Sequence, residues 1–542
     1  MPKTNSGDTM KHIYRQKEVI RVSCVFVFFC FLMGFSVLKI YSIQSDSAYS
    51  AAKVQSTRTI SLGKTRGYIY DMNMKPLVNS VKENMSVIMA DEDSSEMLDI
   101  DAVKIKSGLF LLKNTDTEAQ EGKYSKNFIK IGRYSENQLC SHIIGYINSA
   151  SEGVCGIEKA FDKILSDSAG ELTLEFSCDA NGTVLYGDGL KIIDDSYDCI
   201  AGIKLTIDAG IQQIVQEALI NSSVEKGAVV VLDTKTAQIR AIASIPAYDV
   251  NNIEGSLYDE NLPFLNRALS EYPVGSVFKP IVAAAAIENG ISLKNNYICN
   301  GYMKIGENVF SCYNYTEHGT VDLNKAIEKS CNTFFIDAGL TTGAEKICSM
   351  AEKFGFGSSV TLCSTLFSDA GYVPEGATVS SESELANLCF GQGSLLATPL
   401  QLAAAYNVFA NKGVYIEPAI LSELVDENGN TYAYYKSENT RKVLSADTCG
   451  VIGTCLYNNM LNGTGVSASS ATISSAGKTA TAQTGRYNEN GKEILCTWFC
   501  GYFPYDEPLY TIVVFNEDGT GATADCAPVF KECVEKIYRA IN

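Results

Sequence analysis

The segment that decides the fold and the site is Glu271-Tyr-Pro-Val-Gly-Ser-Val-Phe-Lys-Pro280, followed at once by the alanine-rich stretch 281–287. Its proline and glycine predict a turn that delivers Ser276 to the start of a buried helix, with Lys279 on the same face one turn later. A hydroxyl beside an amine at a helix start is typical of an activated nucleophile. The Ser-x-x-Lys pattern alone does not identify the site. It begins at six serines: Ser36, Ser50, Ser61, Ser223, Ser276 and Ser475.

Length and composition set the class of protein. The chain has 542 residues, which predicts two or three domains. With 46% hydrophobic and 20% charged residues it is globular, not disordered. The net charge of −18 argues against a nucleic-acid partner, which would need basic patches. An acidic balance is a common solubility feature of an exposed domain.

Histidine is scarce, and this scarcity limits the chemistry. The three histidines are His12, His142 and His318. A Ser-His-Asp triad would have only His318 as a realistic base, and a His-rich zinc site is unavailable. We therefore expect any serine chemistry in this chain to use a lysine base.

Cysteine is abundant, with eighteen residues. Cys24 and Cys30 fall in the first apolar run, and the others are scattered without Cys-x-x-Cys pairs. We expect most of them to be small buried hydrophobic side chains. Cys496 and Cys500 share one face of a predicted strand but stand about 13 Å apart, which is too far for a disulfide.

An apolar run near the N-terminus predicts a membrane anchor. Residues 22–38 carry no charge and are flanked by Arg21 and Lys39, whose long side chains extend the predicted span to 22–41. Basic residues before the span place residues 1–21 in the cytoplasm and the rest of the chain outside. Since no convincing small-residue cleavage site follows, we favour an uncleaved anchor over a cleaved signal peptide.

Residues 42–200 form the first predicted domain beyond the membrane, and they carry no catalytic pattern. The segment Arg66-Gly-Tyr-Ile-Tyr-Asp71 alternates like a strand that enters a turn. Further on, Gly153-Val-Cys-Gly-Ile-Glu158 leads into a short helix predicted at 159–165. We interpret this region as a structural or docking module.

Residues 201–542 form the second predicted domain, and its apolar patterns predict both helices and strands. Helices are expected after the N-cap Asp208 and at 323–338, 343–354, 399–410 and 528–541. Strands are expected at 228–232, 239–243, 478–483, 497–502 and 510–515. This order of elements predicts an α+β fold, an antiparallel sheet covered by helices.

Three short motifs occur in order in the second domain: Ser276-Val-Phe-Lys279, Ser330-Cys-Asn332 and Lys478-Thr-Ala480. Each alone has a structural explanation, because Ser330 and Asn332 suit helix caps and turns, and a Lys-Thr pair suits an exposed strand edge. Together, and in this order, they resemble the penicillin-recognising serine acyltransferases, whose motifs are Ser-x-x-Lys, Ser-x-Asn and Lys-Thr-Gly.

The resemblance narrows to class B penicillin-binding proteins and covers nearly all of residues 15–542. It adds the single anchor and the following motifs: Arg66-Gly-x-Ile-x-Asp71, Gly153-x-x-Gly-Ile-Glu158, Phe390-Gly-Gln-Gly393, Thr398-Pro-Leu-Gln401 and Trp498-Phe-x-Gly-Tyr-x-Pro504. In the family, a glycine comes three residues after the aspartate of the first motif. Here Met74 occupies that position. The resemblance implies a serine β-lactamase-like transpeptidase domain at 201–542 and a non-catalytic pedestal or dimerisation domain at 42–200.

The resemblance also implies roles for the first two motifs. Ser276 would attack the penultimate D-Ala carbonyl of a stem pentapeptide and expel the terminal D-Ala, while Lys279, as a neutral amine, would take the serine proton. Ser330 would relay a proton toward the leaving amine, and Asn332 would hold the lysine and the substrate amide. The acyl group would then pass to an amine of a neighbouring peptide. No metal or cofactor is implied.

Substrate contacts are implied for the third motif. Lys478 and Thr479 would hold the terminal carboxylate of the substrate. The oxyanion would lie between the backbone N–H groups of Ser276 and Thr481. Ala480 stands where the family has glycine, so we expect an altered fit of substrate or β-lactam, not inactivity.

The function implied is that of a peptidoglycan D,D-transpeptidase that acts on D-Ala-D-Ala stem peptides and is acylated by β-lactams. A membrane-embedded glycan polymerase and other division or elongation proteins are the implied partners. Two alternatives remain open. One is a β-lactamase or β-lactam sensor of the same superfamily, and the other is a catalytically weak scaffold of a wall-synthesis complex.

Overall fold

The computed structural model describes residues 6–44, 53–90, 103–113, 122–293, 296–379, 381–437 and 439–542, with side chains from residue 14 onward. Ser50 and residues 1–5 of the predicted cytoplasmic tail lie outside the described residues. Two compact units interleave along the chain. Unit 1 comprises Met1–Lys64, Lys82–Lys130 and Glu171–Tyr197, and unit 2 comprises Thr65–Val81, Ile131–Gly170 and Asp198–Asn542. The division into 42–200 and 201–542 remains a prediction; two segments of the first range are built into unit 2.

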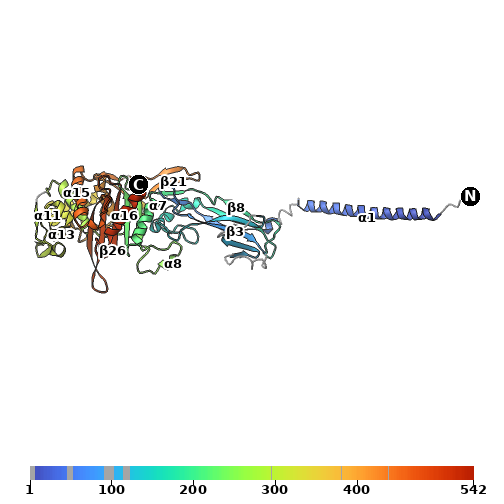
Figure 1. Ribbon diagram of the computed structural model, residues 1–542, viewed down its shortest axis with the longest axis horizontal. Coiled ribbons are helices and arrows are strands. Elements are labelled where there is room, and N and C mark those ends of the chain that lie inside the picture. The colour runs from blue at the N-terminus through green and yellow to red at the C-terminus, as the bar shows by residue number, and fades with distance from the viewer. Residues whose placement is uncertain are drawn as a thin grey trace. The chain divides into compact units, whose positions relative to one another are not determined.

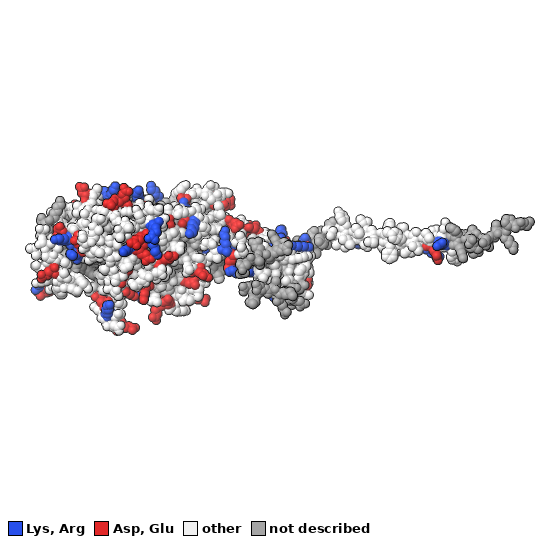
Figure 2. Space-filling view, viewed as in Figure 1, with Lys and Arg blue, Asp and Glu red and all other residues white. Residues whose placement is uncertain are grey.

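The predicted anchor lies within one long helix, α1 (Ser6–Gln44). Its stretch Tyr14–Gln44 is long and apolar enough to cross a membrane, and its side chains are exposed. In Figure 2 this stretch is a run of uncharged side chains with charged ones near its N-terminal end. The helix begins before the predicted span because the polar residues that precede the span include good helix formers.

Unit 1 contains two small sheets. The four-stranded sheet is β4 (Val103–Lys106), β5 (Leu109–Lys113), β3 (Val81–Met89) and β6 (Ser125–Gly132). The three-stranded sheet is β1 (Thr57–Thr65), β7 (Gly170–Ser177) and β8 (Lys191–Asp195). Their apolar faces share one buried cluster, which includes Val87, Leu109, Leu174 and Phe176.

Unit 2 is built on a five-stranded antiparallel sheet in the order β11-β10-β26-β25-β24. Its strands are β10 (Gly227–Asp233), β11 (Ile239–Ile245), β24 (Ala476–Tyr487), β25 (Glu493–Phe503) and β26 (Tyr510–Gly519). The helices α7 (Ala209–Ile220) and α16 (Cys526–Ile541) lie side by side on one face (Figure 1). The predicted α+β fold, the Asp208 cap and the closing helix are confirmed.

The other face of this sheet carries the alanine-rich helix α9 (Lys279–Glu288) and several helices around it. These are α12 (Ala344–Lys353), α13 (Glu382–Cys389), α14 (Pro399–Ala410) and α15 (Ala446–Asn462). The predicted start of α14 is confirmed, because Thr398 and Gln401 form a reciprocal capping box. A fully buried α14 places apolar side chains against the sheet.

Two helix predictions were wrong. The helix expected at 323–338 is divided into α10 (Leu323–Glu328) and α11 (Asn332–Thr342), because the backbone at Ser330 has a φ of 50° and cannot continue the helix. The helix expected at 159–165 is two short helices, α5 (Gly156–Ala160) and α6 (Asp162–Asp167). In the first case the helical spacing of apolar residues continues across Ser330, so the sequence pattern gives no sign of the break.

Two motifs from the first predicted domain meet in unit 2 around a buried carboxylate. Glu158 is fully buried, and its Oε2 lies 3.0 Å from Arg66 Nε. Its Oε1 lies 2.7 Å from Arg133 Nη2 and accepts a hydrogen bond from the Tyr134 hydroxyl at 3.0 Å. Arg66 also contacts Asp162 Oδ1 at 2.7 Å. Because a buried charge is tolerated only when it is paired, this network gives both motifs a structural role.

The turn predicted after Asp71 is also confirmed. Asp71 Oδ1 accepts the backbone N–H groups of Asn73 at 2.8 Å and Lys75 at 2.7 Å. Met74 has a φ of 63°, in the left-handed region that favours glycine. The departure from the family motif therefore lies where the backbone suits glycine better than methionine.

Replacing Glu158 by alanine leaves two arginines without their buried partner. We expect Glu158→Ala to lower the free energy of unfolding of unit 2 by about 3–5 kcal/mol, the usual cost of removing one partner from a buried ion pair. Urea unfolding followed by fluorescence of Trp498, the one tryptophan and a fully buried one, measures this. The control is Glu427→Ala in an exposed turn. Equal stability of the two variants would contradict the structural role of Glu158.

Candidate active site

Ser276 lies in a single 3-10 turn, η1 (Gly275–Phe278), that runs directly into α9. Its side chain is partly exposed, whereas those of the next two residues, Val277 and Phe278, are buried. Gly275 has a φ of 67° and supplies the tight bend before the serine. The predicted delivery of Ser276 to the start of a buried helix is therefore what the structure contains.

Contacts from two distant segments hold the backbone of this turn. The backbone N–H of Gly275 donates to Gly391 O at 2.8 Å, and Trp498 Nε1 donates to Pro273 O at 2.9 Å. A Cβ on Gly391 would lie 2.0 Å from Gly275 O, so only glycine fits there. Two further motifs quoted from the sequence, around Gly391 and Trp498, thus act on the turn that carries Ser276.

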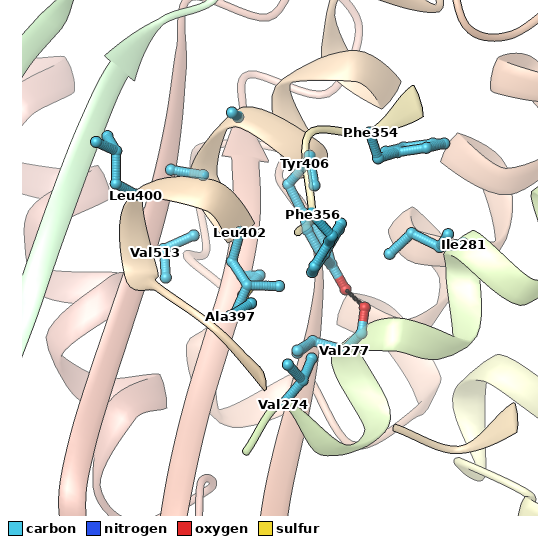
Figure 3. Close-up of a cluster of buried hydrophobic side chains, with 14 of the residues drawn as sticks. Val274, Val277, Ile281, Phe354, Phe356, Ala397, Leu400, Leu402, Tyr406 and Val513 are labelled. Atoms are coloured by element: carbon cyan, nitrogen blue, oxygen red, sulfur yellow. Dashed lines mark hydrogen bonds between the residues drawn. The ribbon is translucent and has the colours of Figure 1, made fainter. Parts of the chain in front are cut away.

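Apolar side chains pack against one side of the turn, as Figure 3 shows. The Tyr406 hydroxyl reaches from α14 and donates to Val277 O at 3.0 Å (Figure 3). The side chains around it are fully or almost fully buried: Val274, Val277, Ile281, Phe354, Phe356, Ala397, Leu400, Leu402 and Val513. Close packing on this side leaves the serine side of the turn as the one that can meet a ligand.

The first and second motifs meet at Lys279. Its fully buried Nζ donates to Ser330 O at 2.7 Å, to Ser330 Oγ at 3.1 Å and to Asn332 Oδ1 at 2.6 Å. Three acceptors match the three donors of an ammonium group. Burial opposes the charged form and lowers the pKa of Lys279 to about 8. The amine can therefore release its proton near neutral pH.

The second motif occupies the break between α10 and α11. The left-handed backbone conformation of Ser330 costs roughly 1–2 kcal/mol because the residue is not glycine. A hydrogen bond from the Cys331 N–H to Ala326 O, at 2.9 Å, helps to hold this conformation. Asn332 is the first residue of α11, and its Nδ2 donates to Ser311 O at 2.8 Å. Asn332 is thus fixed at both ends, by Lys279 and by Ser311.

The third motif lies on the edge strand β24, and the idea that its lysine is an exposed edge residue is wrong. Lys478 is fully buried, and its Nζ donates to Thr464 Oγ1 at 3.3 Å and to Thr479 O at 3.1 Å. The Thr479 hydroxyl donates to Thr464 Oγ1 at 2.7 Å. Burial, and then the charge of Lys279, lower the pKa of Lys478 well below its usual value. A bound carboxylate would raise it again.

Thr464 was not predicted from the sequence. It lies between Gly463 and Gly465, a pattern that reads as an ordinary turn. Asn459 at the end of α15 accepts the Thr464 N–H at 3.0 Å and donates to Gly477 O at 2.8 Å. Asn459 therefore joins the Thr464 turn to the strand of the third motif.

The last residues of the third motif adjoin the Ser276 turn. Ala480 is 3% exposed, and a Cβ placed on Gly275 would lie 3.4 Å from its methyl group. Thr481 is exposed and is paired with Thr497 of β25. The methyl group that distinguishes Ala480 from glycine is therefore buried beside Gly275.

The histidines with described side chains are engaged elsewhere. His318 Nδ1 lies 3.4 Å from Cys299 Sγ, and His142 Nε2 lies 2.7 Å from Pro263 O. Lys279 is thus the basic side chain that contacts the second motif, and its role as a base remains a prediction.

Comparison with known proteins agrees with this arrangement. The family model described as "Penicillin binding protein transpeptidase domain" matches residues 227–535. The chain is 26% identical to peptidoglycan D,D-transpeptidase MrdA of Haemophilus influenzae, over 95% of this chain and 91% of that protein. It is 28% identical to stage V sporulation protein D of Bacillus subtilis, over 76% of this chain and 63% of that protein.

Solved structures share the fold. Penicillin-binding protein 3 of Mycobacterium tuberculosis, complexed with aztreonam, aligns with a TM-score of 0.64 at 24% identity, over 90% of this chain and 97% of that one. A chain from a peptidoglycan synthase complex aligns with a TM-score of 0.70 at 22% identity, over 96% and 99%. Since the family model spans more than half of the sequence and the relatives extend over nearly all of it, the chain belongs to the penicillin-binding protein transpeptidase family, as a class B penicillin-binding protein.

Proposed function

We propose that this chain is a peptidoglycan D,D-transpeptidase that cross-links stem peptides through an acyl-enzyme on Ser276. The observation that carries the proposal is the buried Lys279 amine, which contacts both Ser330 and Asn332 one helical turn from Ser276. A nucleophile next to a base that is itself oriented by further groups is the arrangement that serine acyl transfer requires. The D,D-transpeptidase names of the relatives support the same reaction.

In the acylation step Ser276 Oγ attacks the carbonyl carbon of the penultimate D-Ala, and its proton passes to neutral Lys279. The oxyanion is held by the N–H groups of Ser276 and Thr481, each worth about 2.7–4 kcal/mol in comparable enzymes. As the bond to the terminal D-Ala breaks, Ser330 Oγ passes its proton to the leaving amine and takes the proton of Lys279 in its place, over the 3.1 Å contact with Lys279 Nζ. An amine of a second peptide then attacks the acyl-enzyme.

The third motif orients the substrate. Lys478 and Thr479 hold the terminal carboxylate, and Thr464, which contacts both, fixes their side chains. In a β-lactam, the carboxylate and the strained amide are placed relative to each other like the terminal carboxylate and the cleaved amide of the substrate. A β-lactam therefore acylates Ser276 and remains covalently attached.

The membrane anchor and the partners belong to the same proposal. α1 anchors the chain with residues 1–21 in the cytoplasm, and the catalytic domain faces the cell wall. A membrane-embedded glycan polymerase is the expected partner, since a solved relative comes from a complex that couples polymerisation and cross-linking. In Figure 2 acidic and basic side chains are interspersed over the visible folded surface, which suits no nucleic-acid partner.

Release of D-Ala from a synthetic pentapeptide by the full-length protein in detergent tests the function. We expect Ser276→Ala to abolish release, and Lys478→Ala to weaken it because the carboxylate loses its cation. Ser223→Ala is the matched control, as an exposed serine in another Ser-x-x-Lys sequence. Release by Ser276→Ala at the wild-type rate would contradict the proposal, and rapid hydrolysis of β-lactams would favour the β-lactamase alternative.

The acylation rate should depend on the protonation of Lys279. Its pKa of about 8 means that the neutral amine, the form that accepts a proton, increases as the pH rises through 8. The rate of labelling by a fluorescent penicillin should therefore rise between pH 6 and 9 and then level off. A rate that falls over this range would show that Lys279 is not the base.

Gly391 should be required for an active Ser276 turn. The Cβ of Gly391→Ala would meet Gly275 O at 2.0 Å and displace the turn, so we expect penicillin labelling to fall by about tenfold or more. Gly357→Ala is the control, because Gly357 has the same backbone strain, with a φ of 76°, but its nearest contact is 3.5 Å away. Equal labelling of the two variants would mean that the contact does not position Ser276.

A further inference from the structure

Four potential metal ligands converge beside the second motif. Cys299, Cys312, His318 and Cys331 place their ligand atoms within 4.8 Å of one another. In the parts of the chain that the structure describes, this cysteine–histidine cluster is the only such group of three or more Cys, His, Asp and Glu side chains. The three cysteines are buried, and the histidine is partly exposed.

The distances fit one tetrahedral ion. Cys312 Sγ lies 3.7 Å from Cys299 Sγ and 3.8 Å from Cys331 Sγ. With Zn–S bonds of 2.3 Å, neighbouring sulfurs of a tetrahedron are about 3.8 Å apart. Cys299 Sγ lies 3.4 Å from His318 Nδ1, where a Zn–N bond of about 2.0–2.1 Å gives about 3.6 Å.

The backbone around the cluster is built to hold it. β13 (Tyr297–Cys299) pairs with β16 (Gly319–Val321) so that Cys299 lies opposite Gly319, which brings His318 alongside. The backbone N–H of Gly301 donates to Cys299 Sγ at 3.4 Å, and the Thr333 hydroxyl donates to the same sulfur at 3.3 Å. Donors that point at a sulfur stabilise the thiolate form that a metal requires.

Two simpler explanations fit less well. A disulfide joins only two sulfurs, whereas Cys312 lies at nearly equal distances from two others. Apolar packing of thiols accounts for the remaining buried cysteines, but it does not account for an imidazole nitrogen aimed at a buried sulfur.

We propose that the cysteine–histidine cluster binds one structural Zn²⁺ ion. Three thiolates and an imidazole are a common ligand set for structural zinc. Binding releases the three thiol protons and leaves the site with a formal charge of −1. The family resemblance implied no metal, so this proposal departs from that expectation. The ion takes no part in acyl transfer.

The ion would help to hold the backbone of the second motif in place. Cys331 lies between Ser330 and Asn332, and Cys312 follows Ser311, whose carbonyl oxygen accepts Asn332 Nδ2. One bound ion thus ties together both sides of the Asn332 contact and the left-handed backbone at Ser330. Loss of the ion would release the acceptors that hold Lys279.

Metal analysis of the full-length protein, purified without a histidine tag, tests the site. We expect about one zinc per chain in the wild type and in Cys348→Ser, and a large loss in Cys299→Ser and His318→Ala. Cys348 is the matched control because it is equally buried in α12 and lies outside the cluster. Wild-type protein without zinc, or full zinc retention in the cluster variants, would overturn the proposal.

A measurement on unmutated protein guards against variants that fail to fold. After chelation, the wild type should bind Co²⁺ with the absorption bands of a tetrahedral thiolate complex, and Zn²⁺ should displace them. A folded protein that shows no such bands, or in which Cys312 is mapped in a disulfide after purification without reductant, would overturn the proposal.

The effect of the zinc ion on the position of the second motif rests on the proposed function and is measured separately. Chelated protein should be labelled by fluorescent penicillin about tenfold or more slowly, and adding Zn²⁺ back should restore the rate. Labelling of the zinc-free protein at the wild-type rate would contradict the positioning effect. No labelling of zinc-loaded protein would instead contradict the proposed acylation, so the two failures are distinct.

Discussion

The buried amine of Lys279 is the constraint on which the rest of the catalytic unit depends. An ammonium group taken out of water is strongly destabilised unless acceptors replace the lost solvent. Here the acceptors are Ser330 O, Ser330 Oγ and Asn332 Oδ1. They can converge only because α10 and α11 are separated by a left-handed residue. A continuous helix would carry these groups away from Lys279. The broken helix therefore supplies the acceptors that the buried amine needs, while burial itself lowers its pKa.

The turn that carries Ser276 depends on contacts from elements far apart in the chain. Trp498 reaches it from the sheet, Tyr406 from α14 and Gly391 from the loop after α13. Each contact is to a backbone group of residues 273–277, so the turn is held without any use of the Ser276 hydroxyl. Preorganisation of this kind leaves the reacting group free to meet a substrate while the backbone stays fixed.

Much of the fold followed from local chemistry in the sequence. The cap at Asp208, the start of α14 at Pro399 and the apolar strands of the five-stranded sheet were predictable because neighbouring residues determine them. The motif residues Ser276, Lys279 and Lys478 were found by their order, and the structure brings their segments together. Their individual roles stay predictions until the variants are measured.

The features that escaped prediction depend on tertiary contacts. Ser330 breaks a helix whose apolar period runs on unbroken, so the pattern carried no sign of it. Thr464 looked like part of a glycine turn and matters only because β24 folds back against it. The cysteine–histidine cluster lacks Cys-x-x-Cys spacing, since its ligands come from β13, a loop, the residue before β16 and the cap of α11.

The central claim is that the Lys279 environment makes Ser276 the acylated residue. Mass analysis of peptides from the full-length protein after reaction with benzylpenicillin tests it most directly. We expect one adduct per chain, on the peptide that contains Ser276, and none there after Ser276→Ala. An adduct on another residue, or no adduct on folded protein, would contradict it.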